Sequence, residues 1–349
     1  MAEPTVPSNS SGSNEKPAIQ PGSAADMFDD PTPSGQGTRR FSWVPSLRVI
    51  GLAPLALILL LLVYYIGGMI WITKVDDDIA FGQPSSAPEG GSLTVALIAD
   101  LIEREIETHS WVANDPFFMP GSLLDNMPNF QQGVVTAASR FAIELRDQIA
   151  RTRGSSPVDK NVEKASGFLV YPGDVWIFNP KESWAPTASS EKQYRQAVEA
   201  LRIYNQDVAD GSAVFAPRAD NLLTTIDRVT SDIGSASAGI SRHIRENSGW
   251  WLDFQADDLF YANKGRLYAY YQLMRAMQED FSNVIAEKGL QNAWRLTMIS
   301  LEEAATLQPW VITNGAPDSQ FRPSHLAAQG FYLLRARTQL KEISNILLK

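Results

Sequence analysis

The feature that most constrains this chain is an uncharged apolar run, VIGLAPLALILLLLVYYIGGMIWI, over residues 49–72. About 20 apolar residues in a helix suffice to cross the ~30 Å hydrocarbon core of a bilayer. Tyr64, Tyr65 and Trp71 lie toward its end, where aromatic side chains favour the headgroup level. We therefore predict a transmembrane helix over residues 46–73 that anchors the chain in a lipid bilayer through 49–72.

The charges that flank this run predict its orientation. Three arginines precede it (Arg39, Arg40 and Arg48) and three aspartates follow it (Asp76, Asp77 and Asp78). Since cytoplasmic flanks carry an excess of Lys and Arg, we expect a cytoplasmic N-terminus. A cleaved signal peptide is the alternative, but its apolar core is usually only about 7–15 residues long and an A-x-A site should follow. In a bacterium this topology describes a single-pass inner-membrane protein with a periplasmic C-terminal domain.

Composition divides the rest of the chain into three parts. Residues 1–45 are rich in Pro, Ser and Gly and poor in apolar residues, which predicts a disordered cytoplasmic tail. Residues 74–91, which end in QPSSAPEGG, have the composition of a flexible linker. Residues 92–349 are numerous enough to form a helical periplasmic domain with a sizeable core.

The charge balance and the absence of cysteine exclude several functions. The chain has 30 Lys+Arg against 39 Asp+Glu without a basic cluster, so we expect no nucleic-acid partner. Zero cysteines exclude disulfides, thiolate nucleophiles, Cys-ligated zinc and thioether-linked haem. With only three histidines and no H-E-x-x-H or paired E-x-x-H motif, we expect no metal and no cofactor.

Helical periodicity dominates the domain. Apolar residues recur at steps of three, four or seven over 92–109, 129–149, 190–211, 218–245, 257–287, 290–305 and 326–347. We expect the longest pattern, 257–287, to be the central helix of an irregular bundle. The last one repeats leucine every seventh position (Leu326, Leu333, Leu340, Leu347), which predicts a bundle or coiled-coil seam and a homo-oligomer through 326–347.

One stretch departs from the helical pattern. The β-favouring runs 168–171 and 175–178 are joined by Pro172, Gly173 and Asp174, which predicts a short hairpin. A lone hairpin is marginally stable in water, so it should pack on the helices or on a partner. The predicted fold class is therefore mainly α: one transmembrane helix and an irregular multi-helix bundle with a small β-hairpin insertion.

The most distinctive connection is the segment 110–128, SWVANDPFFMPGSLLDNMP. Loops longer than ~12–15 residues within a compact domain tend to be functional or disordered, and the apolar residues here argue against disorder. Two interpretations remain, an ordered loop that joins two helices and a binding surface. The candidate interaction residues are His109, Trp111, Asn114, Asp115, Phe117, Phe118, Asp125 and Asn126, together with the adjacent Trp250 and Trp251 of a later connection.

Each of the other candidate sites has a simpler structural interpretation. Trp250 and Trp251 are either core anchors or a patch that faces a partner or lipid. His109 follows Glu105 by four residues, a ligand-like spacing, yet it also continues an apolar helix face. Three carboxylates (Glu182, Asp257 and Asp258) could pair as acid and base in a cell-wall hydrolase. An acidic residue at a helix start is more often a cap.

The loop from Asn114 to Gly133, NDPFFMPGSLLDNMPNFQQG, together with the single span and the long helices, resembles a family of uncharacterised single-pass bacterial inner-membrane proteins. That family is known only as a domain of unknown function. The resemblance implies a bacterial origin and a periplasmic helical domain. It offers no catalytic residues to carry over.

These observations favour a non-enzymatic envelope protein whose periplasmic domain binds another envelope protein. No nucleophile elbow and no phosphate loop is present in the sequence. One alternative is a ligand-binding or sensing domain with a pocket among Trp111, Phe117, Trp250 and Tyr270. The other is a cell-wall hydrolase.

Overall fold

A computed structural model describes the chain over residues 47–72, 74–83, 85–151, 157–178, 184–247, 253–316 and 319–349. The predicted disordered tail, 1–45, lies outside these residues, as do Trp250, Trp251 and Glu182. The fold is mainly helical, as the periodicity predicted.

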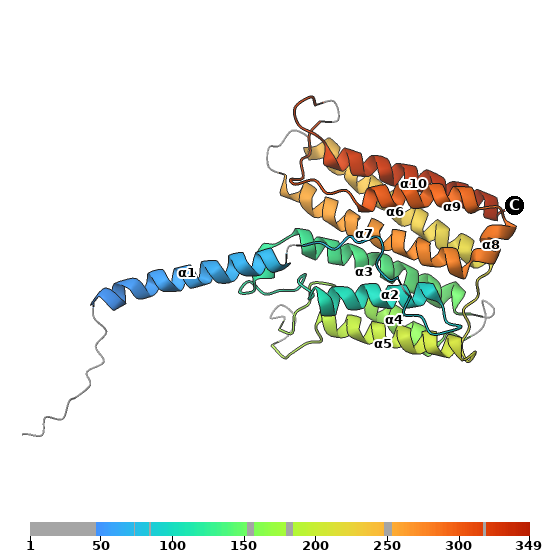
Figure 1. The fold of residues 1–349 in the computed structure, drawn as a ribbon, viewed down its shortest axis with the longest axis horizontal. Coiled ribbons are helices and arrows are strands. Elements are labelled where there is room, and N and C mark those ends of the chain that lie inside the picture. Colours follow the sequence, from blue (N-terminus) through green and yellow to red (C-terminus); the bar gives the residue numbers. More distant parts are fainter. Residues whose placement is uncertain are drawn as a thin grey trace, which may run out of the picture. The chain divides into compact units, whose positions relative to one another are not determined.

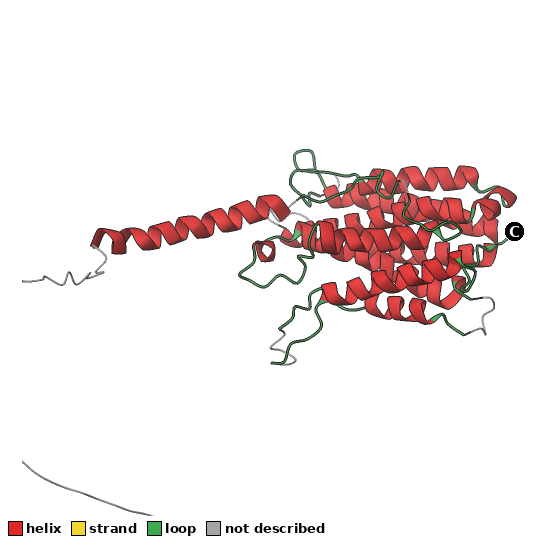
Figure 2. Ribbon diagram, turned by 60° about the horizontal axis from the view of Figure 1, so that its bottom comes forward, coloured by secondary structure: helices red, strands yellow, loops and turns green. Residues whose placement is uncertain are grey.

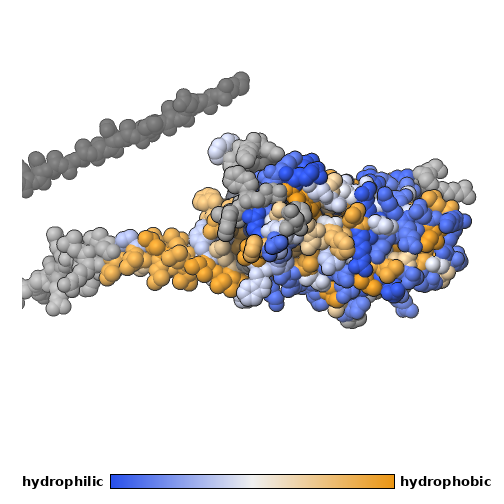
Figure 3. Space-filling view, turned by 90° about the horizontal axis from the view of Figure 1, so that it is seen from above, coloured by the Kyte–Doolittle hydropathy of each residue, from blue (hydrophilic) through white to orange (hydrophobic). Residues whose placement is uncertain are grey.

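The apolar run forms the helix α1, Leu47–Ile72. Its stretch Pro54–Ile72 is long and apolar enough to cross a membrane. Figure 3 shows its side chains as a nearly continuous apolar surface, whereas polar and apolar residues are mixed over the coloured, visible face of the body. A helix that is apolar all round needs either a protein core or lipid around it, and these side chains are not buried in the chain. The helix is confirmed, and its place in a bilayer stays a prediction.

Among the described residues of 74–349, nine further helices form the body. They are α2 (Leu93–Glu103), α3 (Asn126–Glu144), α4 (Lys160–Leu169), α5 (Ser190–Ala209), α6 (Ala219–Asn247), α7 (Phe254–Asp280), α8 (Ser282–Glu287), α9 (Gln291–Ala305) and α10 (His325–Leu347). Short π-helices, η1 (Arg104–Thr108) and η3 (Leu145–Ile149), extend α2 and α3, and a 3-10 turn, η2 (Pro120–Leu123), lies in the loop before α3. Helix positions therefore follow the predicted ranges closely, except that α4 was not predicted.

The long helices run up and down, so their connections gather at two ends of the body (Figure 1). One end carries the described parts of the connections 109–125, 170–189 and 306–324, together with Asp253 before α7; we call it the anchor end, because the chain enters the body there after α1. The other, the distal end, carries the connections 150–159, 210–218 and 281–290 and the C-terminus. Figure 2 shows that the longer loops extend from the anchor end.

Helix α7 is the central element of the body, as predicted for 257–287. It packs against α2, α3 and α9, while α6, α9 and α10 pack together on one side and α2, α4 and α5 on the other. Its buried residues point in all directions and include Lys264, Tyr268, Tyr270 and Gln272. The pair α3 and α7 joins the two groups of helices.

Two glycines let α3 and α7 touch through their backbones. A Cβ on Gly133 would lie 2.2 Å from the carbonyl oxygen of Ala262, and one on Gly265 would lie 2.0 Å from that of Phe130. Both distances are far below a van der Waals contact. The crossing therefore requires a residue without a side chain on each helix.

The predicted β-hairpin is wrong, since no strand forms among the described residues. Phe168 and Leu169 end α4. Asp159 caps the N-terminus of this helix by accepting hydrogen bonds from two backbone amides. The second half of the predicted hairpin meets a different partner: the amide of Ser190 donates to the carbonyl of Val175 at 3.0 Å. Helix α4 buries one apolar face in the core, and that tertiary burial outweighs the local β preference of its last residues.

The leucines of the predicted seam are used inside the chain. Leu326, Leu333, Leu340 and Leu347 are buried, and α10 packs on α6 and α9. A second copy cannot reach them while the body is folded. A homo-oligomer would need another face of α10, such as the one that exposes Phe331 and Leu334.

Candidate functional site

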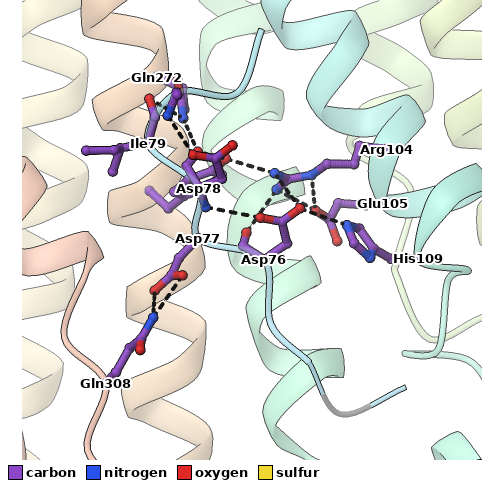
Figure 4. A network of polar contacts seen from close by, with 11 residues as sticks. Asp76, Asp77, Asp78, Ile79, Arg104, Glu105, His109, Gln272 and Gln308 are labelled. Carbon is purple, nitrogen blue, oxygen red and sulfur yellow. Dashed lines mark hydrogen bonds and ion pairs between the residues drawn. The ribbon is translucent and has the colours of Figure 1, made fainter. Parts of the chain in front are cut away.

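The segment that follows α1, residues 74–82, forms an ordered strap that starts at the anchor end and runs along α7 from Lys264 to Arg275 (Figure 4). Val75, Ile79 and Phe81 pack against the core. These residues belong to the range 74–91 that we assigned to a flexible linker. The three aspartates, which we interpreted as a simple membrane flank, are the strap's principal polar contacts.

Asp77 forms a buried ion pair with the central helix. The Nζ of Lys264 lies 2.8 Å from Asp77 Oδ2 and also donates to the carbonyl oxygen of Leu307 at 2.6 Å. Gln308 donates to both oxygens of Asp77, at 3.0 and 2.8 Å. Lys264 is only 2% exposed, and burial lowers its pKa while Asp77 opposes that change. The pair links the strap to α7 and to the loop after α9.

Asp76 contacts the end of α2. Its carboxylate lies 3.5 Å from Arg104 and 3.3 Å from Nε2 of His109. Arg104 also binds the fully buried Glu105 at 2.8 Å and lies over the ring of Phe81, 4.4 Å from its centroid. Burial raises the pKa of Glu105, and the guanidinium of Arg104 opposes that rise. His109 is thus a predicted site residue that contacts the strap.

Backbone carbonyls of the strap accept hydrogen bonds from three turns of α7. The carbonyl of Asp78 accepts from the hydroxyl of Tyr268 at 2.8 Å and from the amide of Gln272 at 3.0 Å. Arg275 donates to the carbonyls of Ile79 and Phe81. The strap is therefore held by its backbone as well as by its side chains, which couples the chain leaving α1 directly to the central helix.

Trp111 and Asn114 fasten the loop 110–125 to the body. The Trp111 indole donates to the carbonyl of Gly173 at 2.8 Å and meets the ring of Tyr194 edge-on at 5.0 Å. The Asn114 amide donates to the carbonyl of Val175 at 2.9 Å and to Glu191 at 3.1 Å. Both side chains are buried, so this part of the loop is structural.

Phe117 and Phe118 point away from the core. With two residues of the connection 170–189 they form a chain of edge-on ring contacts: Phe117 to Phe118 at 5.4 Å, Phe118 to Trp176 at 5.8 Å and Trp176 to Phe178 at 5.6 Å. Phe117 is 84% exposed. This aromatic row joins two loops that lie about 60 residues apart in the sequence.

The carboxylates of Asp115 and Glu191 lie close enough to interact electrostatically. Partial burial, together with the charge of Glu191, raises the pKa of Asp115 to about 6. A Cβ on Gly121 would lie 2.1 Å from the carboxylate of Asp115, so the loop closes tightly over this side chain.

Asp125 and Asn126 meet the start of α7. The Asn126 amide nitrogen, in the orientation that gives it acceptors, donates to Asp257 at 2.6 Å and to Asp125 at 3.1 Å. Asn129 donates to Asp258 at 2.8 Å. Burial raises the pKa of Asp257 to about 6, and the charges of Asp125 and Asp258 add to the rise.

A third polar cluster, which the sequence did not predict, closes the opposite side of the anchor end. Nε2 of His243 lies 2.8 Å from Asp253, which caps α7 and accepts from Asn314 at 2.9 Å. Nothing in the spacing of these residues signals the contact, because they belong to three separate segments.

The four residues of the predicted ligand pocket do not converge. Trp111 packs on Tyr194, Phe117 is exposed, and the hydroxyl of Tyr270 donates to Asp232 at 2.8 Å inside the α6–α7 interface. Trp250 lies outside the described residues. A groove of about 300 Å³ lies elsewhere, between α3, the end of α4 and α5, and its lining includes Gln132, Thr136, Arg140, Val170 and Tyr171. Among the described residues, no group of three or more His, Asp or Glu side chains is arranged to hold a metal.

Comparison with known proteins gives one match. The model of a family described as an uncharacterized protein conserved in bacteria (DUF2333) matches residues 47–249 and 241–349. No curated protein and no solved structure matches the chain. The resemblance inferred from the loop at Asn114 to Gly133 is confirmed.

Proposed function

Because the chain belongs to the DUF2333 family of bacterial proteins, we propose that it is a single-span inner-membrane protein whose helical body binds another envelope protein in the periplasm. We assign it a scaffolding role without catalysis. The observation that carries the proposal is the strap, because it fixes the body to the end of α1 through the buried ion pair of Asp77 with Lys264 and the half-buried pair of Asp76 with Arg104.

A rigid strap suits a protein that must present a surface at a fixed height above the membrane. A flexible linker would let the body sample many orientations at no cost in stability. Burying charged pairs instead is energetically demanding, since desolvation can exceed the attraction between the charges. Buried charged pairs of this kind suit a protein that requires a defined geometry, such as a scaffold that holds a partner next to the membrane.

The groove between α3, α4 and α5 is the surface that we assign to the partner. It combines apolar walls with the polar side chains of Gln132, Thr136 and Arg140, a mixture typical of transient interfaces. Its volume, about 300 Å³, accommodates a few side chains of a partner protein.

Site-specific photocrosslinking in native membranes tests this assignment. A crosslinker at Val170, which is exposed and lines the groove, should give a discrete adduct, and one at the exposed Ser235 of α6 should give none. Arg140→Ala should weaken the Val170 adduct. Absence of any adduct at Val170, combined with no self-association of the purified protein, would contradict the proposal.

The proposed topology has its own test. Protease added to intact spheroplasts should digest residues 92–349, because N-in orientation places them outside the cytoplasmic membrane. A C-terminal part that resists digestion until the membrane is lysed would refute the periplasmic location.

A cell-wall hydrolase is the second candidate function. It is favoured by Asp257, whose pKa of about 6 suits a general acid that works near neutral pH. Incubation of the purified full-length protein with peptidoglycan should then release soluble fragments, and Asp257→Asn should abolish the release. If the parent protein released fragments and Asp257→Asn released none, a catalytic function would replace the scaffolding proposal.

A further inference from the structure

We propose that the loops of the anchor end insert aromatic side chains into the headgroup region of the membrane that holds α1. The inference depends on the proposed function, since it requires α1 to remain in the bilayer. It adds a second contact with lipid, made by the body itself.

The body exposes its large aromatic side chains at one end. Among the described residues, those outside α1 that are exposed are Phe117, Phe118, Phe178, Trp184, Phe254, Trp310, Phe321 and Phe331. All except Phe331 lie in the anchor-end connections or at the first residue of α7. Trp310 and Phe321 are fully exposed and Trp184 is 88% exposed, whereas tryptophan is ordinarily among the well-buried residues.

Several exposed aliphatic residues accompany them. Leu123, Val170, Ile177 and Val311 lie in the same connections. At the distal end, the exposed large apolar residues among those described are Val214 and Leu348. Exposed apolar side chains gathered on one face mark a contact with lipid or with a partner.

The length of chain between α1 and the body decides between contact with lipid and contact with a protein partner. α1 ends at Ile72, and Val75 already packs against the core, so two residues separate the span from the body. An extended chain advances at most about 3.6 Å per residue, so Ile72 and Val75 are at most ~11 Å apart. The headgroup layer on each side of a bilayer is itself roughly 5–8 Å thick. The strap therefore holds the anchor end at the headgroups.

A protein partner does not fit in this space. A single α-helix with its side chains is about 10–12 Å in diameter, so no folded domain can enter between the anchor end and the lipid. Tryptophan and phenylalanine favour the interface between water and hydrocarbon, where their rings leave water. We therefore assign these loops to lipid, and the groove on α3, α4 and α5 remains available to a protein.

Two carboxylates of the strap do not oppose contact with a lipid surface, although Asp125 and Asp174 of the anchor-end connections are exposed. The carboxylates of Asp76 and Asp77 face Arg104 and Lys264 inside the body and do not project toward anionic headgroups. Lys74, adjacent to the span, is exposed.

The absence of native cysteine allows a direct test with the full-length protein in nanodiscs of phosphatidylethanolamine and phosphatidylglycerol. Single variants Trp310→Cys, Phe321→Cys and Phe117→Cys receive an environment-sensitive fluorophore. Val214→Cys and Leu348→Cys are matched controls at the distal end, and Leu60→Cys is the control within α1. Lipids with a quencher at the top of the acyl chain report contact.

If the inference holds, the three loop labels lose at least half as much emission as the Leu60 label, and the two distal labels lose none. Loop labels that behave like the distal ones, while the Leu60 label is quenched, overturn the inference and leave the anchor intact. A Leu60 label that escapes quenching refutes the proposed span itself. Loop labels that are shielded from aqueous iodide but not quenched by lipid overturn the lipid contact and indicate a protein contact.

Discussion

The two ends of the body use polar residues in opposite ways. At the distal end Asp280 caps the N-terminus of α2, accepting from the amides of Leu93 at 3.0 Å and Thr94 at 2.9 Å. Gly211 and Gly289 adopt positive φ where α5 and α8 end. These contacts satisfy backbone groups at the ends of helices, as any helix bundle requires. At the anchor end, the carboxylates of Asp76 and Asp77 pair with Arg104 and Lys264 to hold a segment of chain that is not helical.

We infer from this difference that the anchor end has a role beyond folding. Short connections and helix caps are sufficient to close a bundle, and the distal end has these. The anchor end has long loops, exposed aromatics and buried charges, none of which is required to close a bundle. Variants at the two ends measure how much of the protein's stability depends on the helix caps of the distal end and how much on the buried charges of the anchor end.

The largest expected effect is at the strap. Lys264→Ala leaves the carboxylate of Asp77 buried without its cation, so the free energy of unfolding should fall by about 3–5 kcal/mol. Urea unfolding of the full-length protein in detergent, followed by tryptophan fluorescence, measures this loss. The exposed pair Arg335 and Glu303, 2.9 Å apart, supplies the control: Arg335→Ala should cost at most about 1 kcal/mol.

A double variant separates charge from packing. Lys264→Met with Asp77→Asn removes both charges and keeps the volume, so it should recover a large part of the stability lost in Lys264→Ala. An unchanged urea midpoint in Lys264→Ala would show that the strap is not held by this pair, and the contrast between the two ends would disappear.

The next largest effect is expected where α3 crosses α7. Gly133→Ala places a methyl group against the backbone of Ala262, so it should destabilise the protein by about 1–3 kcal/mol through overpacking. Gly239→Ala in α6, where a Cβ meets open space, should instead stabilise by roughly 0.5–1 kcal/mol because alanine favours the helix. Thermal unfolding monitored by circular dichroism compares the two. If Gly133→Ala left the stability of the protein unchanged, α3 and α7 would be able to move apart without any loss of stability.

A smaller effect is expected at the distal end. Asp280→Ala removes the acceptor for two amides of α2, and loss of a helix cap typically costs about 0.5–2 kcal/mol. Hydrogen exchange should show the faster opening confined to the first turn of α2. Exchange that accelerates throughout α7 would indicate that Asp280 supports the core as well.

The smallest effect concerns pH. The pKa of Asp257 is about 6 in the folded protein against 3.8 ordinarily, so the folded state binds its proton more tightly than the unfolded state does. This stabilising contribution is present at low pH and is lost as the pH rises toward 6. Asp257→Asn should therefore be more stable than the parent at pH 7.5, by about 1 kcal/mol after solvent screening.

The same comparison at pH 4 provides the control for that prediction. There the carboxyl group of the folded parent is protonated, so the difference from Asp257→Asn should vanish. A difference that is equal at both pH values would assign the effect to packing instead of ionisation.

Local sequence patterns predicted the elements of this fold well. Helix positions follow from apolar periodicity, which neighbouring residues define, and the seven predicted ranges each contain a helix. The failures lie where a segment takes its structure from distant partners. Residues 168–171 prefer strand locally, yet they end a helix whose inner face contacts the core.

The candidate site was predictable only in part. The spacing of Glu105 and His109 drew attention to the end of α2, and the composition of 110–128 singled out Phe117 and Phe118. Lys264 gave no signal beyond a charge within a helix of mostly buried residues, because its partner Asp77 lies far away in the sequence. The strap could not be foreseen from residues 74–91 alone, whose composition is that of a linker.

By itself, the sequence determined the apolar helix, the mainly helical class and the family, since each depends on residues that are close together along the chain. Only the tertiary structure decided that the strap is fastened to α7, that two glycines allow the central crossing, and that the exposed aromatics share one end. These features depend on contacts such as that of Tyr268 with Asp78, which are 190 residues apart. Contacts of that kind form only when the whole chain has folded, because no local preference encodes them.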